Sequence, residues 1–326
     1  MDEQRARTLW GSLRGKIALS FLLGLAIIIA LAIYADLSRL GSTLARFRWG
    51  YLPLVLGLTL LNYAFRFLKW EFYLRQVGIE VRKVESAAIF ASGLTMVMTP
   101  GKVGEFLKSY LLKQVSGAPM SLSAPIVAAE RLTDGLAMVV LATMGLMIYP
   151  FGRPIIMAVA ALLLTLVALI QFRPLALHLL RWGRKLPLLS RLAKELDTLY
   201  ESAYTLLTPR NLAVAIALSV VSWGGECVAF YLILVGLGLP GLPSLLLRAA
   251  FIFGSSAVMG AISFLPGGLG VADASLAGLT LLLTGVERST AVAASLLIRL
   301  STLWFGATLG LAVLFIFRRH FFSSGG

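Results

Sequence analysis

The sequence predicts an all-α polytopic membrane protein with about six full transmembrane helices and two broken-helix hairpins of the re-entrant type, arranged as an inverted repeat. Three observations predict this class: the composition, the length of the apolar runs, and a motif that occurs twice. Of the 326 residues, 59% are hydrophobic and 13% are charged, and the mean hydropathy is +0.89. An average soluble domain is about half apolar and about a quarter charged, so an ordinary soluble protein is excluded.

The charge balance is strongly basic, with 29 Lys and Arg against 15 Asp and Glu and a net charge of +14. These basic residues lie mostly in short segments between apolar runs, which is the pattern of cytoplasmic loops in membrane proteins. The expected partners are therefore anionic lipids and not nucleic acid. The single cysteine, Cys227, excludes an internal disulfide.

Six apolar runs are long enough to cross a bilayer, which requires about 20 residues. They are residues 17–35, 51–70, 123–149, 154–172, 212–239 and 291–317. The first run follows four basic residues, as in a signal peptide, but it is too long for a typical signal segment. It is therefore expected to be a retained anchor.

Two further regions contain shorter apolar stretches interrupted by Pro and Gly. The first joins residues 86–99 to 103–116 through Pro100-Gly101-Lys102, and the second joins residues 244–265 to 271–283 through Pro266-Gly267-Gly268-Leu269-Gly270. Proline and glycine interrupt helices, and irregular backbone within a membrane needs protein or a water-filled cavity around it. Each region is therefore predicted to be a hairpin that lines a cavity.

The loop charges predict a multi-pass protein of the cell membrane with both termini in the cytoplasm. The N-terminal segment, residues 173–211 and the C-terminal tail all carry an excess of basic residues. Residues 173–211 are also expected to form an amphipathic linker on the cytoplasmic surface within a single membrane domain, residues 1–326. Residues 36–50 do not follow this charge rule, because they contain three arginines yet are placed outside the cell by the predicted orientation.

An internal repeat is predicted from two short patterns. Pro100 to Gly104 and Pro266 to Gly270 share P-G-x-x-G at a separation of 166 positions, and Arg131 and Arg299 each begin R-L-[TS] at a separation of 168. The repeat halves would be residues 51–149 and 212–317. With the predicted orientation the two hairpins enter from opposite faces, which is the arrangement of many secondary transporters.

Charged residues inside the predicted membrane region are the candidate substrate-binding residues, because each needs a partner or a function. They are Arg66, Lys102, Glu105, Lys108, Glu130, Arg131, Asp134, Glu226, Asp273 and Arg299. Glu105 and Lys108 are expected to share a helical face and to pair or bind both signs of a zwitterionic headgroup. Glu130, Arg131 and Asp134 fit either ligand contacts or structural ion pairs.

The remaining candidates also have two interpretations each. Arg66 either extends to the membrane interface or contacts a ligand. Glu226 is expected to pair with Arg248 or Arg299, with protonation and proton coupling as alternatives. Asp273 either caps a helix or binds ligand. Arg131 and Arg299, if they face one cavity, suit an anionic phosphate.

Several catalytic and metal-binding patterns are absent from the sequence. The histidines are His178 and His320 alone, so the sequence contains no His/Cys metal motif and no Ser-His or Cys-His pair. It also lacks a G-x-x-x-x-G-K-[ST] nucleotide loop. We therefore expect neither a metal nor another cofactor, and not an enzyme, although carboxylates and arginines alone can build one.

Three motifs resemble the lysylphosphatidylglycerol synthase transmembrane, or flippase-like, family. They are Thr99 to Lys108, Glu130 to Asp134, and Leu265 to Val271 followed by Asp273. The resemblance covers nearly the whole chain. Lys102 and Lys108 stand where the family usually has Arg, and Asp273 stands where it usually has Glu, so each charge is kept.

The resemblance implies a stand-alone lipid translocator, or the partner of a separate lipid-modifying enzyme. In two-part members of the family, the membrane region is associated with moving an aminoacylated phospholipid that a soluble domain makes, and this chain has no room for that domain. The headgroup phosphate would bind Arg131, Arg299 and Lys108, and any amine would bind Glu105 or Asp134.

Two other functions stay open, as does the assembly of the chain. One is a membrane-embedded transferase or accessory subunit that acts on lipid-linked substrates with Glu105 or Asp134 as a base. The other is a small-solute transporter. The lipid, the direction, the energy source and the oligomeric state, including a homo-oligomer, are not predicted.

Overall fold

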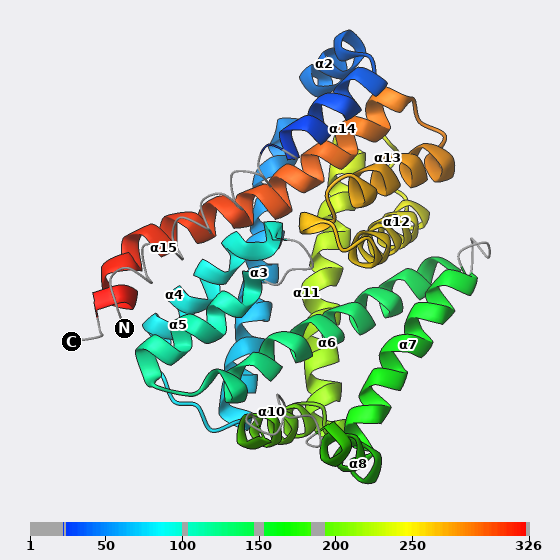
Figure 1. Ribbon diagram of the computed structural model, residues 1–326. Coiled ribbons are helices and arrows are strands. Elements are labelled where there is room, and N and C mark those ends of the chain that lie inside the picture. The colour runs from blue at the N-terminus through cyan, green and yellow to red at the C-terminus, as the bar shows by residue number, and fades with distance from the viewer. Residues whose placement is uncertain (1–21, 23, 100–103, 147–152, 184–192, 324–326) are drawn as a thin grey trace.

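The computed structural model describes residues 22, 24–99, 104–146, 153–183 and 193–323, and in this part of the chain every regular element is a helix (Figure 1). The predicted all-α membrane class is thereby confirmed. Pro100, Gly101 and Lys102 lie outside the described residues. The same is true of residues 17–21 and 23 of the first predicted run, residues 147–149 of the third, and residues 184–192 of the linker.

Among the described residues, six helical segments are long and apolar enough to cross a membrane. They are Trp49–Gln76, Arg153–Gln171, Pro209–Gly236, Pro243–Ile262, Pro266–Thr284 and Arg288–Arg318. Four of them match predicted runs. The third predicted run forms α6 (Met120–Leu146), which has the length of a span but contains Glu130, Arg131 and Asp134.

The first predicted run ends at a sharp bend. Helix Gly24–Tyr34 turns by 96° into α2 (Leu37–Arg46), and the Asp36 side chain accepts a hydrogen bond from the Ser38 amide at the start of α2. Residues 36–50 are therefore not a plain external loop. Because α2 exposes Arg39 and Arg46 on one face and packs Leu40 on the other, its arginines suit a helix at the membrane interface.

The first half of the molecule contains η1 (Trp49–Tyr51), α3 (Leu52–Gln76), α4 (Lys83–Leu94), η2 (Thr95–Met98), α5 (Leu107–Ser116) and α6. The arms α4 and α5 pack against each other as a hairpin. Helix α5 ends at Gly117, whose φ of 72° is the left-handed conformation that favours glycine after a helix.

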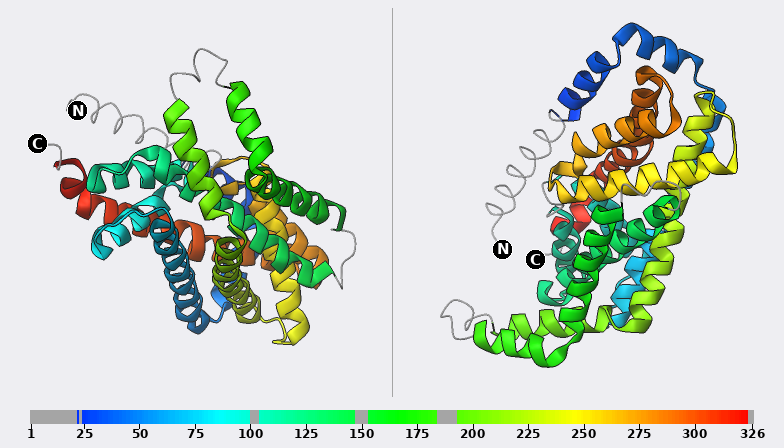
Figure 2. Two further views of the ribbon diagram at one scale, coloured as in Figure 1. Left: turned by 90° about the horizontal axis from the view of Figure 1, so that it is seen from below. Right: turned by 90° about the vertical axis from the view of Figure 1, so that its right-hand side faces the viewer.

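In the described part of the connection between the halves lie three helices: α7 (Arg153–Gln171), α8 (Arg173–Gly183) and α10 (Ala193–Leu206). Helix α7 buries few residues and exposes an apolar surface suited to lipid. Helices α8 and α10 lie at the end of the molecule opposite α2 (Figure 2). The exposed Arg173 and Glu201 form an ion pair between them.

The second half contains α11 (Pro209–Gly236), α12 (Pro243–Ile262), η5 (Pro266–Gly268), α13 (Val271–Thr284), α14 (Arg288–Arg299), the π-helical segment η6 (Leu300–Trp304) and α15 (Phe305–Ser323). Helices α12 and α13 pack together, so the second Pro-Gly region is also a hairpin. Gly267, Gly268 and Gly270 have φ values of 58°, 66° and 83°, which explains the glycines of this turn.

The two halves interlock. Helix α3 packs along α11, α6 packs on α12, and α15 packs on α4. The hairpin ends meet, because η2 contacts η5. Small residues allow the closest approaches: a Cβ atom added at Gly310 of α15 would lie 2.6 Å from the Ala91 carbonyl oxygen of α4.

Candidate functional site

Six charged side chains gather between α3, α5 and α6, and we call them the charge cluster. They are Lys69, Glu105, Lys108, Glu130, Arg131 and Asp134. Five of them are buried, and only the Arg131 side chain is partly exposed, at 22%. Five of the six were predicted as site residues, and the structure brings these five together.

The ion pairs of the charge cluster connect three elements. Lys69 Nζ on α3 lies 2.5 Å from Asp134 Oδ1 on α6. Arg131 bridges two carboxylates, with Nε 3.1 Å from Glu105 Oε2 and Nη2 3.0 Å from Asp134 Oδ2. Lys108 on α5 pairs with Glu130 on α6.

The charge cluster is electrically neutral, because it has three cations and three carboxylates. A single charge at the bilayer centre costs at least about 2.5 kcal/mol, so mutual pairing is what makes this burial tolerable. Polar neighbours add hydrogen bonds: Ser219 on α11 accepts from Lys69 at 2.7 Å and donates to Asp134 at 3.0 Å. The cluster therefore links α3, α6 and α11.

Lys108 is held from its other side by aromatic rings. Its Nζ lies 4.7 Å from the ring centroid of Trp70 and 5.5 Å from that of Phe90. A cation over an aromatic face gains electrostatic stabilisation, more so when it is away from water. The Lys108 ammonium group is thereby held between Trp70 of α3 and Phe90 of α4.

Arg66 and Glu226 lie between α3 and α11. The Arg66 guanidinium stacks over the Trp223 ring at 5.6 Å, and it is close enough to Asp134 and Glu226 for electrostatic interaction with both. The buried Glu226 accepts a long hydrogen bond, 3.5 Å, from Thr59. Arg66 is buried here, so the interpretation that it extends to the membrane interface is wrong.

A second ion pair lies in the other hairpin. Arg299 Nε is 2.8 Å from Asp273 Oδ1, and Arg299 Nη2 donates to the Gly267 carbonyl at 2.8 Å. Asp273 Oδ2 also accepts from the Gly270 amide at 2.8 Å, so this carboxylate both caps α13 and holds an arginine. Arg299 thus ties the Pro-Gly turn to the end of α14.

Two predicted pairings are wrong. Glu105 does not pair with Lys108: Lys108 pairs with Glu130, and Glu105 pairs with Arg131, both on α6. Glu226 pairs with neither Arg248 nor Arg299, because the Arg248 guanidinium donates to the Leu283 carbonyl and Arg299 holds Asp273.

The two arginines of the repeat bind different carboxylates, and the shared phosphate site stays a prediction. Arg131 belongs to the charge cluster, and Arg299 belongs to the separate pair with Asp273. In this conformation Arg131 is paired with Glu105 and Asp134, and Arg299 is paired with Asp273.

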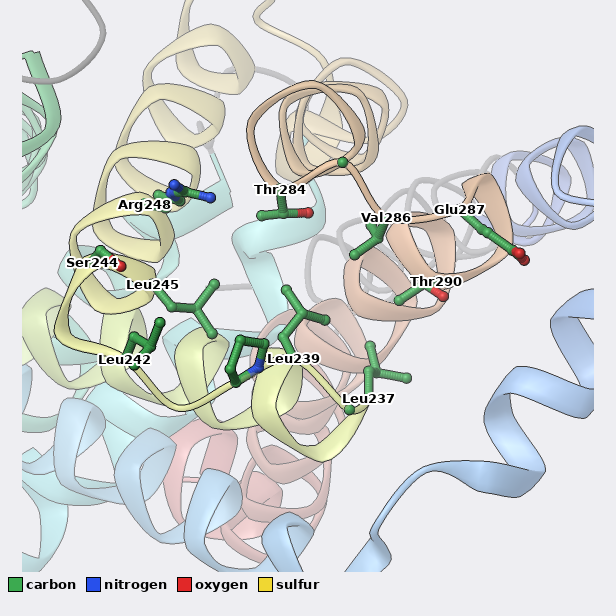
Figure 3. A pocket seen from close by; sticks show the side chains of 13 residues that line it. Leu237, Leu239, Leu242, Ser244, Leu245, Arg248, Thr284, Val286, Glu287 and Thr290 are labelled. Atoms are coloured by element: carbon green, nitrogen blue, oxygen red, sulfur yellow. The ribbon is translucent and has the colours of Figure 1, made fainter.

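A cavity of about 510 Å³ lies at the open end of the second hairpin, where α12 begins and α13 ends (Figure 3). It is lined from the turn after α11 by Leu237 and Leu239, from α12 by Ser244 and Arg248, and from the α13–α14 turn by Glu287. None of the predicted site residues lines it.

Sequence analysis missed Lys69 as a site residue. Lys69 lies near the end of the apolar run 51–70, and the free-energy cost of placing its charge in the membrane equals that of the predicted site residues. Its spacing of three from Arg66 was a usable signal, because that spacing places both cations on one face of α3. Ser219 gave no such signal, since serine is common in membrane helices.

Comparison with known proteins identifies the family. The family model described as the lysylphosphatidylglycerol synthase TM region matches residues 21–310. The chain belongs to this family. The resemblance predicted from the motifs is therefore confirmed.

Two relatives have similar length. A UPF0104 membrane protein of Methanothermobacter thermautotrophicus is 26% identical over 317 residues, which cover 89% of this chain and 90% of that protein. The UPF0104 membrane protein PH1989 of Pyrococcus horikoshii is 24% identical over 323 residues, covering 90% of this chain and 94% of that protein. The family and the apolar helices together make this chain a multi-pass membrane protein.

Proposed function

We propose that this protein moves a lipid with a polar, phosphate-bearing headgroup between the leaflets of the cell membrane. The observation that carries the proposal is the neutral charge cluster, buried in a chain whose outer surface is apolar. A structural role needs only one ion pair per buried charge. Here three cations and three carboxylates form four ion pairs at the end of a broken-helix hairpin, and with Arg131 partly exposed they offer both signs of charge to a ligand.

The chemistry is an exchange of ion-pair partners. A headgroup phosphate takes the place of Glu105 on the Arg131 guanidinium, which suits phosphate because its N–H groups bind two oxygens at once. A headgroup amine then pairs with the released Glu105. Because a zwitterionic headgroup adds no net charge, the neutrality of the cluster is kept while the acyl chains stay in lipid.

The family and the loop charges support the remaining parts of the proposal. The matched family is named for the membrane region of a lipid-modifying enzyme, so a lipid substrate is the chemical class that fits. The excess of basic residues at both ends of the chain favours cytoplasmic termini. A separate lipid-modifying enzyme would supply the substrate.

The test is a leaflet-reversal assay in proteoliposomes that contain a trace of labelled lipid. Phosphatidylethanolamine, lysylphosphatidylglycerol and phosphatidylglycerol, each with a reducible fluorophore on an acyl chain, are compared for wild type, Glu105→Gln and Arg131→Ala. Lys113→Ala, at an exposed position of the same hairpin, is the control. We expect protein-dependent movement in wild type and control and its loss in both cluster variants.

Two outcomes would overturn the proposal. One is no movement of any of these lipids by folded wild-type protein. The other is a change in the mass of the recovered lipid without movement, which would indicate a transferase acting on lipid-linked substrates instead.

A further inference from the structure

The helices of the two halves correspond in order and position. A constant separation of 168 residues relates the ends of α4 and α12, the ends of α5 and α13, and the starts of α6 and α14. These positions are Leu94 and Ile262, Ser116 and Thr284, and Met120 and Arg288. The glycines after α5 and α13, Gly117 and Gly285, are also 168 apart and have φ values of 72° and 69°.

The arginine–carboxylate pairs correspond in the same register. Glu105 and Asp273 are 168 positions apart, as are Arg131 and Arg299. In both halves Nε of the arginine faces the carboxylate, at 3.1 Å from Glu105 and 2.8 Å from Asp273. The two ion pairs are therefore equivalent contacts between the hairpin end and the helix that follows the hairpin.

The packing of the hairpins is reciprocal. The helix after the first hairpin, α6, packs on α12 of the second, and α15, which continues the helix after the second hairpin, packs on α4 of the first. Two contacts exchanged in this way are typical of elements related by a two-fold axis.

The long helices α3 and α11 give the direction of that axis. Thr59 of α3 contacts Glu226 of α11, whereas Lys69, further along α3, contacts Ser219, earlier on α11. The two helices therefore run antiparallel. If α3 and α11 are equivalent, one half is inverted in the membrane relative to the other.

The centre of the α3–α11 contact is symmetric. Asn62 Nδ2 donates to the Ser222 carbonyl at 3.0 Å, and Ser222 Oγ donates to the Asn62 carbonyl at 3.2 Å. These residues are 160 positions apart, as are the helix ends Gln76 and Gly236. Reciprocal bonds between equivalent residues place a two-fold axis at this point.

We infer that α3–α6 and α11–α15 are inverted repeats about the Asn62–Ser222 contact, and that Asp273–Arg299 is the positioning pair of the second half. The second part rests on the proposed function. An axis perpendicular to antiparallel α3 and α11 exchanges the membrane faces. The two hairpins therefore open to opposite faces of the membrane. Within each half, the arginine–carboxylate pair holds the end of the hairpin against the helix that follows it, which keeps that hairpin closed. In Figure 1 the α5–α6 connection lies in the lower part and the α13–α14 connection in the upper part.

The second pair differs from the first in what it positions. Arg299 is followed by the π-helical segment η6, and it holds the Gly267 carbonyl of the hairpin turn. A π-segment interrupts the regular hydrogen bonding of a helix, is a common place for a kink and is frequent at functional sites, so we take η6 as the hinge of this helix. Release of Arg299 from Asp273 frees the turn and the hinge together.

The first test is the sidedness of two equivalent positions, and it needs no transport. Pro119→Cys and Glu287→Cys, 168 residues apart and both exposed, are made in a Cys227→Ala background. In intact cells and inverted vesicles, a membrane-impermeant maleimide should label the two cysteines from opposite faces. Labelling of both from one face would overturn the inverted repeat, even if lipid transport is intact.

The second test is access to the interior of each hairpin. Ser109→Cys and Ala277→Cys are equivalent buried positions on α5 and α13. Adding Arg299→Ala should make Ala277→Cys label about tenfold faster from the membrane face to which the second hairpin opens, and it should leave the labelling rate of Ser109→Cys unchanged. Arg131→Ala should have the reverse effect on the two cysteines. Arg299→Lys should restore slow labelling, because it keeps the charge.

Other results of the second test would overturn the positioning role. They are unchanged labelling in Arg299→Ala, or faster labelling of both cysteines from both faces, which is a general loosening of the fold. If labelling follows the expectation but no lipid moves, the proposed function fails while the inverted repeat stands.

Discussion

Lys69 Nζ lies 2.5 Å from Asp134 Oδ1, so a buried ion pair joins α3 to α6. Removing one partner of such a pair leaves an uncompensated charge and costs about 3–5 kcal/mol. We expect Lys69→Met to lower the free energy of unfolding by that amount, and Lys69→Met with Asp134→Leu to cost less than the sum of the single changes. Denaturation in detergent measures this. Lys113→Met, at an exposed site, should change stability by less than about 0.5 kcal/mol.

Arg131 contacts two carboxylates with different nitrogens, which a lysine cannot reproduce with its single ammonium group. Arg131→Lys should therefore slow lipid movement by about tenfold, which corresponds to the loss of one charge-assisted hydrogen bond. The leaflet-reversal rate measures the effect. Arg173→Lys, in the exposed pair with Glu201, is the matched control, and equal rates for both variants would contradict a ligand-binding role for Arg131.

Gly310 allows α15 to approach the backbone of α4. An added Cβ atom would lie 2.6 Å from both the Ala91 carbonyl oxygen and the Thr95 amide nitrogen, and backbone atoms cannot move aside cheaply. We expect Gly310→Ala to cost about 1–3 kcal/mol of stability, as overpacked sites do. Gly57→Ala on α3 meets no atom within 4 Å and should be neutral or slightly stabilising. A comparison of melting temperatures in detergent decides between them.

Tyr63 reaches the π-helical segment. Its hydroxyl donates to the Thr302 carbonyl at 2.7 Å, a group that the irregular helix leaves available. Tyr63→Phe should cost about 0.5–1.5 kcal/mol, the contribution of one hydrogen bond, while the exposed Tyr34→Phe should cost nothing measurable. Hydrogen exchange at residues 300–304 should rise in Tyr63→Phe alone. Unchanged exchange would show that the segment does not depend on Tyr63.

The fold class was predictable because hydropathy reports directly on membrane spans. Apolar runs of about 20 residues occur for one physical reason, the thickness of the bilayer, and four of the six predicted runs coincide with long apolar helices. The 96° bend before α2 was not predicted. Its local signal was present in Asp36 and Ser38, which form a capping contact, but an apolar run that ends in a loop has the same appearance.

The members of the site were more predictable than their partners. The free-energy cost of placing a charged side chain in the bilayer depends on that residue alone, so it identifies site members individually. In this way it identifies Glu105, Glu130, Arg131 and Asp134. Pairing depends on where each helix begins and which helix packs beside it. Arg66 and Glu226 are 160 positions apart in the sequence and meet only because α3 packs along α11.

The three charges of α6 also set the order of assembly. Glu130, Arg131 and Asp134 together oppose insertion of this helix alone by roughly 7–10 kcal/mol on the translocon scale. Their partners Lys69, Glu105 and Lys108 are synthesised earlier, so α6 enters the lipid as a group with α3 and α5. In a glycosylation-mapping assay, α6 should insert poorly by itself and efficiently after residues 49–119. Membrane insertion of α6 is then cooperative with that of α3 and α5. A variant that lacks the Lys69 charge should therefore be degraded by membrane quality control, and its amount in the membrane should fall.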